Sequence, residues 1–360
     1  MDRLQALAKV LVGYSTRVQP GDKVLIEAIG VRTFPMVEVL MAEIRKAGGI
    51  PFYLLHDEMV KRANLHGATE TELALEGDFQ KARMEQMDCW IGIRGNENPF
   101  ELADVPADVK ALASEHIMKK VHLDVRVPKT RWVLLRWPSF NFAQSAQMPT
   151  RVFEQFFFDA CCADYEAMSL AMDPLVALMS KTDKVHIVAP GTDITFSIKD
   201  IPVVKCDGKM NIPDGEVFTA PVRDSVNGGI KYNTPTLFEG KVYDGITFVF
   251  ESGRIVKATC EVGSEVLLNE ILDRDEGARF IGEFAIGVNL FVTQPMLDTL
   301  FDEKIAGSIH FTPGNAYEGM ADNGNRSKIH WDLVLRQDPE NGGGEVWFDD
   351  VLVRKDGKFV

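Results

Sequence analysis

The chain has 360 residues, of which 46% are hydrophobic and 26% charged, a composition typical of a globular protein long enough for two domains. Its formal net charge of −14 at pH 7 argues against nucleic acid and anionic membranes as partners, because both would repel it at long range. This acidity suits a metal-binding protein with a cationic or zwitterionic small substrate. It suits equally well a protein that needs charge only for solubility.

The cysteines and the N-terminal segment narrow the class further. Five cysteines are too few and too scattered for a disulfide framework or a C-x-x-C metal knuckle. Residues 1–23 have apolar residues at helical spacing and lack the apolar core and cleavage site of a signal peptide. No stretch approaches the roughly 20 apolar residues that a membrane span requires. We therefore expect a cytoplasmic protein with no membrane partner.

The first half of the chain alternates strand and helix patterns. Short apolar runs predict four strands, at 23–28, 51–56, 89–95 and 131–137. Helical patterns lie between them, at about 35–47, 69–87 and 106–120. Because helices of ten or more residues separate the strands, the pattern predicts an open α/β domain with a parallel sheet. Its first strand–helix turn has no G-x-G-x-x-G or P-loop motif, so nucleotide binding is not favoured over a scaffolding role.

The second half of the chain has a different pattern of predicted secondary structure. Residues 149–181 form a helical region in two parts, and Pro174 is expected to start or kink the second part. Past Asp183 the chain consists of short strand patterns with turn signals, and one inserted helix runs from Ser264 to about Asp273. We therefore predict a β-rich α+β domain, with the boundary near residue 182 and the two domains at 1–182 and 183–360.

The strongest local signal for a metal site is His330-Trp331-Asp332, at the predicted start of an apolar strand. Residues i and i+2 of a strand point to the same face, so His330 and Asp332 project together as a natural pair of metal ligands. The motif alone is weak. His122-Leu123-Asp124 has the same spacing, and we interpret it as an ordinary surface or turn feature.

Three further residues accompany the second copy of the motif. His310 ends a short apolar segment, Glu283 lies inside an apolar strand between two glycines, and Glu216 follows a Pro-Asp-Gly turn. A buried, unpaired carboxylate costs several kcal/mol, so Glu283 should face a cation or a hydrated cleft. Together, two Glu, two His and one Asp are enough for two divalent ions. Spacing leaves simpler alternatives open. In these, Glu216 is a charge on an edge strand, Glu283 forms an ion pair with an arginine, and His310 is a core histidine whose hydrogen bonds are satisfied.

Six segments carry a resemblance to a known family. They are NIPDGEVFTAPV, GKVYDGITFVFESGRIV, IGEFAIGVN, IHFTPGNAY, NRSKIHWDLVL and GGGEVWFDDVLVRKDGKF. In this order they resemble the thermophilic aminopeptidase T family of metallopeptidases, with high specificity over roughly residues 183–360. The N-terminal half is similar mainly in type and layout.

The resemblance implies a site and a mechanism. The implied metal ligands are Glu216, Glu283, His310, His330 and Asp332. Glu283 is also the implied general base, and Tyr317 is placed to stabilise the tetrahedral intermediate. The metals are two divalent ions per chain, Zn²⁺ in the first place, with Co²⁺ or Mn²⁺ as alternatives. Gly215 and Glu318 depart from the residues common in the family, without removing a ligand.

The implied function is a metal-dependent aminopeptidase. It removes the N-terminal residue of short peptides through a metal-activated water, as a cytoplasmic homodimer that binds no nucleic acid. Domain 1–182 is then expected to act as a scaffold that, through the dimer, limits which substrates enter. Two alternatives stay open: a related metallohydrolase acting on other amides, such as N-acyl amino acids, and a non-catalytic binding protein stabilised by its metal.

Overall fold

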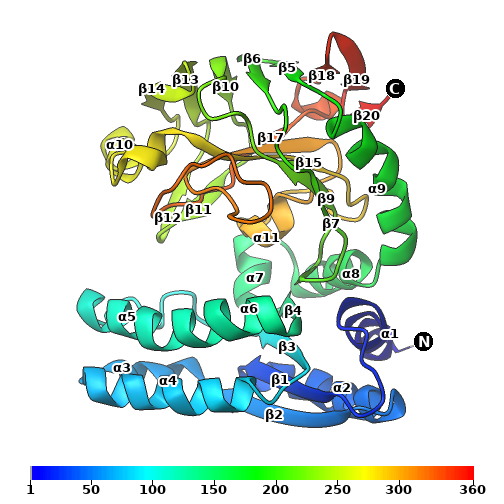
Figure 1. Ribbon diagram of the computed structural model, residues 1–360, viewed down its shortest axis with the longest axis vertical. Helices are drawn as coiled ribbons and strands as arrows, with labels where there is room; N and C mark the ends of the chain where they lie inside the picture. The colour runs from blue at the N-terminus through cyan, green and yellow to red at the C-terminus, as the bar shows by residue number, and fades with distance from the viewer. Residues whose placement is uncertain (1) are drawn as a thin grey trace. The chain divides into compact units, whose positions relative to one another are not determined.

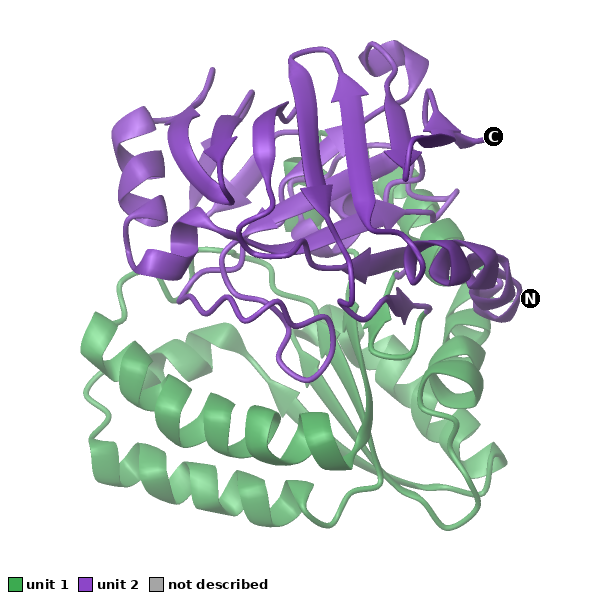
Figure 2. Cartoon of the chain, turned by 45° about the horizontal axis from the view of Figure 1, so that its top comes forward, with its two compact units in different colours: residues 1–163, 208–213 green, residues 164–207, 214–360 purple. Residues whose placement is uncertain are grey.

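A computed structural model describes residues 2–360, which form two compact units (Figures 1 and 2). Unit 1 comprises Met1–Ala163 and Gly208–Pro213, and unit 2 comprises Asp164–Asp207 and Asp214–Val360. The division at Ala163 falls earlier than the expected boundary near residue 182. The reason is helix α9 (Tyr165–Met179), whose buried residues Met172 and Met179 belong to the core of unit 2. No composition change marks this point in the sequence.

Unit 1 is built on a five-stranded parallel sheet with the order β2-β1-β3-β4-β8. The strands are β1 (Lys23–Ile29), β2 (Ile50–His56), β3 (Cys89–Arg94), β4 (Arg131–Arg136) and β8 (Asn211–Ile212). The first four confirm the predicted strands. The fifth comes from the segment that returns from unit 2, and its two residues pair with Leu134 and Leu135 of β4.

Helices surround this sheet. They are α1 (Arg3–Lys9), η1 (Val10–Ser15), η2 (Val31–Thr33), α2 (Phe34–Lys46), α3 (Glu58–Leu65), α4 (Glu70–Met84), α5 (Ala107–Ala113), η3 (Ser114–Arg126), α6 (Val127–Lys129), α7 (Phe140–Ser145) and α8 (Thr150–Cys161). Met84 of α4 and Val121 and Val125 of η3 pack with Leu25 and Trp90 of the sheet, whereas α2 contacts β1 and β2. The predicted helix at 106–120 extends further, because α5, η3 and α6 follow one another without a break.

Unit 2 contains two larger antiparallel sheets and a small two-stranded one. The orders are β14-β13-β10-β6-β5-β18-β19-β20, β17-β16-β15-β9-β7 and β11-β12. The strands are β5 (Lys184–Ala189), β6 (Thr192–Ser197), β7 (Val204–Cys206), β9 (Glu216–Thr219), β10 (Asn227–Lys231), β11 (Thr236–Phe238), β12 (Lys241–Tyr243), β13 (Thr247–Glu251), β14 (Arg254–Thr259), β15 (Ile281–Gly287), β16 (Ser308–Pro313), β17 (Val334–Arg336), β18 (Glu345–Phe348), β19 (Val351–Lys355) and β20 (Lys358–Phe359).

Aromatic side chains join the two larger sheets of unit 2. Phe196 of β6 lies 5.0 Å from both Phe284 of β15 and Phe311 of β16, measured between ring centroids. Such contacts add to the hydrophobic stabilisation from the buried area itself. The β-rich character of this unit confirms the predicted α+β class, and α10 (Glu265–Leu272) confirms the inserted helix. The remaining helical elements are η4 (Glu276–Arg279), α11 (Thr299–Asp302) and η5 (Pro339–Asn341).

The structure also shows where the helix that contains Pro174 begins. Pro174 does not start the second helix of residues 149–181, because α9 begins at Tyr165, where the Asp164 side chain accepts a hydrogen bond from the Ala167 amide as an N-cap. Pro174 lies inside that helix. Across residues 2–360, no helix is both long and apolar enough to cross a membrane.

Candidate metal centre

Three neighbouring strands of the five-stranded sheet in unit 2 place three of the predicted ligands on one face. Glu216 begins β9, Glu283 lies in β15 and His310 lies in β16. Ala285 of β15 pairs with His310, and Gly287 pairs with Glu216. Directly opposed residues of antiparallel strands share a face, and so do alternate residues along one strand. The three side chains therefore project to the same side of the sheet.

Small residues between the ligands leave room for them. Ala285 and Gly287 follow Glu283 on the same face of β15, and a Cβ at Gly287 would lie only 2.3 Å from the carbonyl oxygen of Ile305. The other face of these strands carries Phe284 and Phe311, which are fully buried in the core. The alternation in FIGEFAIG thus buries one face in the core and directs carboxylate and imidazole groups to the other.

The remaining two predicted ligands come from the segment before β17. The predicted strand at His330 is wrong in its bounds, because β17 begins at Val334 and His330 makes only an isolated bridge to Gly314. The pair nevertheless projects together, with His330 Nε2 3.2 Å from Asp332 Oδ1. Gly314 permits the close approach, since a Cβ there would lie 2.1 Å from the Ile329 carbonyl oxygen.

All five predicted ligands meet in one cluster. His310 Nε2 lies 3.5 Å from Glu216 Oε2 and 3.4 Å from Glu283 Oε1. The other oxygen of Glu283 lies 3.1 Å from His330 Nε2. Ligand atoms of Glu216, Glu283 and His310 fall within 4.8 Å of one another, and so do those of Glu283, His330 and Asp332. Glu283 belongs to both groups, which makes it the residue able to bridge two ions.

The hydrogen bonds of His330 indicate that a cation fits between these groups. Its Nδ1 lies 2.8 Å from the carbonyl oxygen of Asn315, which can only accept, so Nδ1 carries the hydrogen. In the neutral ring, Nε2 then presents a lone pair to the carboxylate oxygens of Glu283 and Asp332. Among residues 2–360, neither Nε2 nor the buried Oε2 of Glu216 makes a hydrogen bond. Lone pairs directed at one another are the arrangement that a metal ion stabilises.

The pKa shifts of the histidines and carboxylates in the cluster also indicate that this site stabilises positive charge. Burial acts to lower the pKa of His310, but the Glu216 and Glu283 carboxylates raise it to about 9. Burial acts to raise the pKa of Glu283, but the nearby imidazoles of His310 and His330 outweigh it and hold that pKa below its ordinary value. The carboxylates thus retain a proton on each imidazole when no other cation is present, and a divalent ion replaces those protons.

Comparisons with known proteins agree with this chemistry. A sequence model described as "Thermophilic metalloprotease (M29)" matches residues 1–359. This chain belongs to the thermophilic metalloprotease family M29. Membership in M29 confirms the resemblance seen in the sequence, and with it the prediction of a metal-dependent peptide hydrolase.

Individual relatives of this M29 protein extend over most of its length. Aminopeptidase T from Thermus thermophilus is 32% identical over 389 residues, covering 92% of this chain and 92% of the relative. Aminopeptidase T from Thermus aquaticus is 33% identical over 226 residues, where the match spans 52% of the relative. The solved structure of wild-type AmpT from Thermus thermophilus has a TM-score of 0.82 at 24% identity and covers 99% of both chains, which confirms the fold.

Tyr317 lies at the edge of the M29 cluster. Its ring makes edge contacts with His330, at 4.9 Å between centroids, and a tilted contact with Phe218 at 5.3 Å. The residue is 42% exposed, so a substrate can reach it. Desolvation and the negative charges of Glu283 and Asp332 raise the pKa of the Tyr317 hydroxyl well above its ordinary value, which keeps it protonated as a hydrogen-bond donor.

The sequence did not identify several residues that complete the cluster. Lys304, only 1% exposed, lies 2.6 Å from Glu216 Oε1, 2.6 Å from Glu303 Oε1 and 3.5 Å from Asp214 Oδ1. Glu303 also shares a possible ligand group with His310 and Asp332. In the sequence, FDEKIAG resembles an exposed charged turn, and no spacing signals that it is buried.

A hydrogen bond fixes the carboxylate of Asp332, one of the predicted ligands. Thr312 Oγ1 donates to Asp332 Oδ1 at 2.7 Å. Such contacts orient a ligating carboxylate before an ion arrives. His310 differs, because its Nδ1 has no hydrogen-bond partner in the described part of the chain, and its ring is oriented by packing and by the contact of Nε2 with Glu283 Oε1 at 3.4 Å.

Proposed function

We propose that this M29 protein is an aminopeptidase in which Glu216, Glu283, His310, His330 and Asp332 hold two divalent metal ions. The observation that carries the proposal is the shared position of Glu283 in two ligand groups. The buried ammonium of Lys304 lies beside the carboxylates of Glu216, Glu303 and Asp214, and the cluster also contains the carboxylates of Glu283 and Asp332, so carboxylates outnumber this lysine. Glu303 is an additional candidate ligand on the same grounds.

The donor set favours zinc. Imidazole nitrogens and carboxylate oxygens without a thiolate suit Zn²⁺, and Co²⁺ or Mn²⁺ can bind the same donors. Cys206 lies near Asp214 and Glu216, but burial raises the pKa of its thiol well above the ordinary value, so it is not a ready thiolate ligand.

The residues of the site have separate roles in peptide hydrolysis. When bound, the ions lower the pKa of water and polarise the scissile carbonyl. Glu283, buried with its carboxylate held between two histidines, takes the proton of the attacking water and passes it to the leaving amine. Tyr317 donates a hydrogen bond to the oxyanion that develops on the carbonyl. The carboxylate excess attracts the free α-amine of the substrate, which limits cleavage to the first residue.

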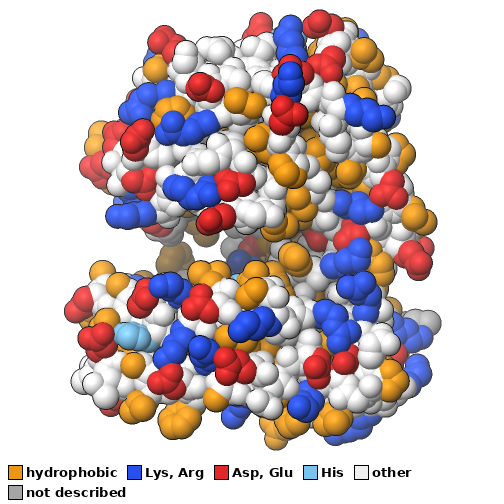
Figure 3. Space-filling view, viewed as in Figure 1, with side chains coloured by type: hydrophobic (Ala, Val, Ile, Leu, Met, Phe, Trp, Pro, Cys, Tyr) orange, Lys and Arg blue, Asp and Glu red, His pale blue; other side chains and the backbone are white. Residues whose placement is uncertain are grey.

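Substrates and assembly follow from the same proposal. Unit 1 acts as a scaffold that restricts the site to short peptides, in a cytoplasmic homodimer. Acidic and basic side chains are interspersed over the face drawn in Figure 3, and such a surface differs from the basic stripe of nucleic-acid-binding proteins. Light scattering tests the assembly, and a monomer that readily degrades folded proteins would contradict it.

The decisive experiment measures metal content together with hydrolysis of leucine anilide. We expect about two ions per chain, loss of turnover on chelation, and recovery on adding Zn²⁺, Co²⁺ or Mn²⁺. A protein that unfolds on chelation and never shows turnover is instead a binding protein stabilised by its metal. Turnover of N-acylated but not free-amine substrates identifies a different amide hydrolase, because only an aminopeptidase requires the amine.

A further inference from the structure

Two overlapping ligand groups make up the metal centre, and we name each by its histidine. The His310 position consists of Glu216, Glu283 and His310. The His330 position consists of Glu283, His330 and Asp332. In a centre with two ions each position holds one of them, so a fixed charge that contacts only one position makes the two ions unequal.

Lys304 supplies such a charge. Of the five predicted ligands, it forms an ion pair only with Glu216, whose Oε1 lies 2.6 Å from the lysine Nζ. In the described part of the chain, no lysine or arginine forms an ion pair with Glu283 or Asp332. The permanent positive charge therefore contacts the His310 position and not the His330 position.

The two oxygens of the Glu216 carboxylate consequently have different surroundings. Oε1 lies against the Lys304 ammonium. Oε2 lies 3.5 Å from His310 Nε2 and makes no hydrogen bond among residues 2–360. Oε2 is thus the oxygen that an ion at the His310 position would bind, and this ion would share the charge of the carboxylate with the ammonium. Sharing weakens its attraction to Glu216.

Backbone contacts hold Lys304 in this place. The buried Asn289 joins it to the segment that carries Glu216: the Asn289 amide donates to the Lys304 carbonyl oxygen at 3.1 Å, and the Asn289 side chain donates to the Asp214 carbonyl oxygen at 2.6 Å. Withdrawing the ammonium would also remove the cation from Glu303, whose Oε1 lies 2.6 Å from Nζ, and breaking a buried ion pair is strongly destabilising. The ammonium therefore keeps its place when an ion binds nearby.

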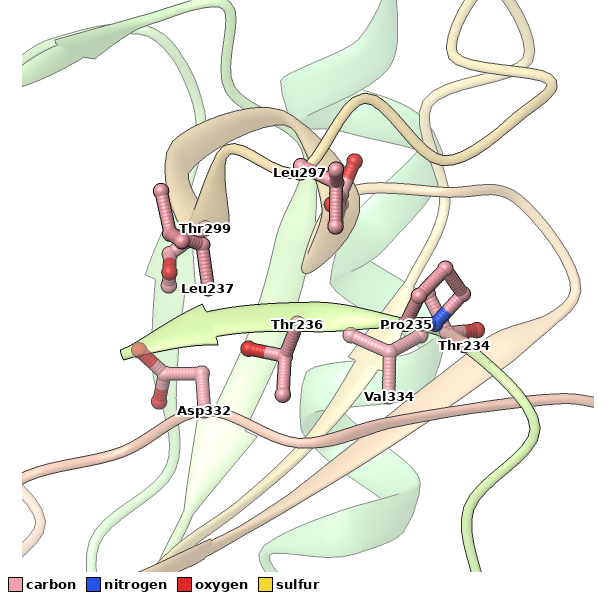
Figure 4. Close-up of a pocket in the computed structure, with 9 residues that line it drawn as sticks. Thr234, Pro235, Thr236, Leu237, Leu297, Thr299, Asp332 and Val334 are labelled. Atoms are coloured by element: carbon pink, nitrogen blue, oxygen red, sulfur yellow. The ribbon is translucent and has the colours of Figure 1, made fainter. Parts of the chain in front are cut away.

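The surroundings of Asp332, at the His330 position, contain no comparable charge. Figure 4 shows Asp332 beside Thr236 at one side of a small cavity. The volume of this cavity is about 10 Å³, which is room for about one water molecule. Among residues 2–360, no lysine, arginine or histidine lines it. Apart from His330, the side chain that contacts the Asp332 carboxylate is the neutral hydroxyl of Thr312.

We infer that Lys304 makes the two positions unequal, so that the His310 position binds its divalent ion at least about tenfold more weakly than the His330 position. This inference rests on the proposed function and specifies how its metal centre is loaded. The size follows from the effect of one charge on another, because a charge within 4–6 Å changes the proton affinity of a carboxylate roughly ten- to a thousandfold. A divalent ion carries twice the charge of a proton and is repelled more strongly.

The first test asks which position holds the weaker ion. Repulsion between two ions makes the second weaker in any such centre, so inequality alone does not decide. Calorimetric titration of the metal-free protein with Zn²⁺, against a competing chelator, is compared in Glu216→Gln and Asp332→Asn. We expect the tighter ion to remain in Glu216→Gln and to weaken at least about tenfold in Asp332→Asn. If Glu216→Gln weakens the tighter ion as much as Asp332→Asn does, the assignment is overturned.

The second test changes Lys304 itself. Lys304→Met removes the charge and the hydrogen-bond donors, whereas Lys304→Gln removes the charge but keeps an N–H donor. We expect the ratio of the two Zn²⁺ dissociation constants to fall at least about tenfold in both variants, because the weaker ion tightens. If Lys304 only orients Glu216, the Met variant weakens that ion and the Gln variant preserves it, which overturns the inference. The control is Lys205→Met, whose ion pair with Asp173 at 2.6 Å lies outside the cluster and whose loss should leave the ratio unchanged.

A third measurement starts from the metal-loaded protein, so that it does not depend on folding of the metal-free variants. Dialysis against increasing chelator should leave about one ion on the wild type over a range of concentrations in which Lys304→Gln still holds about two. Loss of both ions together in the two proteins overturns the role of Lys304.

These measurements separate failure of the inference from failure of the proposed function. Unequal ions that respond to Lys304 as expected, without turnover of leucine anilide, support the inference, and the aminopeptidase proposal then fails alone. Normal turnover with a ratio that Lys304→Gln leaves unchanged overturns the inference and leaves the aminopeptidase intact. A protein that binds no Zn²⁺, Co²⁺ or Mn²⁺ contradicts both.

Discussion

Each unit of this protein contains a strand carboxylate that lies beside at least one histidine. Only the carboxylate of unit 2 has surroundings that suit a metal ion. In unit 1, Glu27 of β1 lies 3.4 Å from His56 Nε2, 2.8 Å from Trp90 Nε1 and 3.1 Å from the Arg126 guanidinium. In unit 2, Glu283 lies between His310 and His330. No lysine or arginine pairs with Glu283 among residues 2–360.

The difference lies in the kind of positive charge that each carboxylate meets. Arg126 is permanently charged, so it neutralises Glu27 and leaves no site for an ion. It also lies 3.8 Å from the Trp90 ring centroid, as a cation–π contact. The histidines at Glu283 can release their protons to a binding metal ion and ligate it, which a guanidinium cannot do. The comparison predicts that changes in the unit 1 cluster affect stability, whereas changes at Glu283 affect catalysis.

Glu283→Gln carries the largest expected effect. The substitution keeps the shape but removes the proposed base and the proposed bridging charge, so kcat for leucine anilide should fall about 10²- to 10⁴-fold. Metal content should fall as well. The matched control is Glu27→Gln, which should retain metal and turnover per folded molecule. Activity of Glu283→Gln within about tenfold of wild type means that the role assigned to Glu283 is wrong.

Lys304→Met should lower the free energy of unfolding more than it lowers catalytic activity. Removing the ammonium leaves Glu216, Glu303 and Asp214 without their shared cation, and breaking a buried ion pair costs about 3–5 kcal/mol. We expect that loss in the metal-free protein, measured by urea unfolding. The loss should be smaller in the metal-loaded protein, because bound ions take over part of the charge compensation.

The control for Lys304 is Lys355→Met, at a surface pair in which Lys355 Nζ lies 3.0 Å from Glu345 Oε1. It should leave the stability of both states nearly unchanged, because solvent screens an exposed ion pair. If Lys304→Met destabilises the loaded and metal-free proteins equally, Lys304 and the ions do not compensate the same charge.

Glu27 should govern stability in acid. Burial acts to raise its pKa, but the contacts with His56 and Arg126 outweigh it and lower the pKa to about 2, from 4.5 in the unfolded chain. Its contribution of about 3 kcal/mol is therefore fully present above pH 4.5 and is lost as the pH falls towards 2. Urea unfolding of the wild type and Glu27→Gln should differ by that amount at pH 7 and converge near pH 2. Curves that stay parallel contradict this assignment.

The sequence was most informative where periodicity decides the structure. Continuous apolar runs such as 89–95 are specific for buried parallel strands, and they were placed to within a residue or two. Short strands such as β8 leave no pattern in two residues, and their pairing depends on contacts distant in the chain. The unit boundary at Ala163 was missed for the same reason, because only packing assigns α9 to unit 2.

For the site, the family resemblance in motif order supplied five predicted ligands and Tyr317, and the structure brings these residues together. Lys304 and Glu303 could not be found in this way. Charged residues are normally exposed, and nothing in FDEKIAG indicates that its lysine is 1% exposed. Burial of a charge is decided by partners far away in the chain, here Glu216 and Asp214.

The two His-x-Asp motifs give the smallest expected effect and the clearest test of this reasoning. His122 and Asp124 lie in helical segment η3, where residues two apart do not share a face, and His122 faces Arg126 at 3.3 Å and Trp132. Burial and the charge of Arg126 lower the pKa of His122 to about 4. The charged neighbour of His122 is therefore a cation, whereas the charged neighbours of His330 are the carboxylates of Glu283 and Asp332. His122→Ala should leave metal content and kcat/KM within about twofold of wild type, at a cost of about 1 kcal/mol in stability. His330→Ala should lose metal and activity. Equal losses from the two substitutions would mean that spacing, and not the charge that each histidine faces, identifies a ligand.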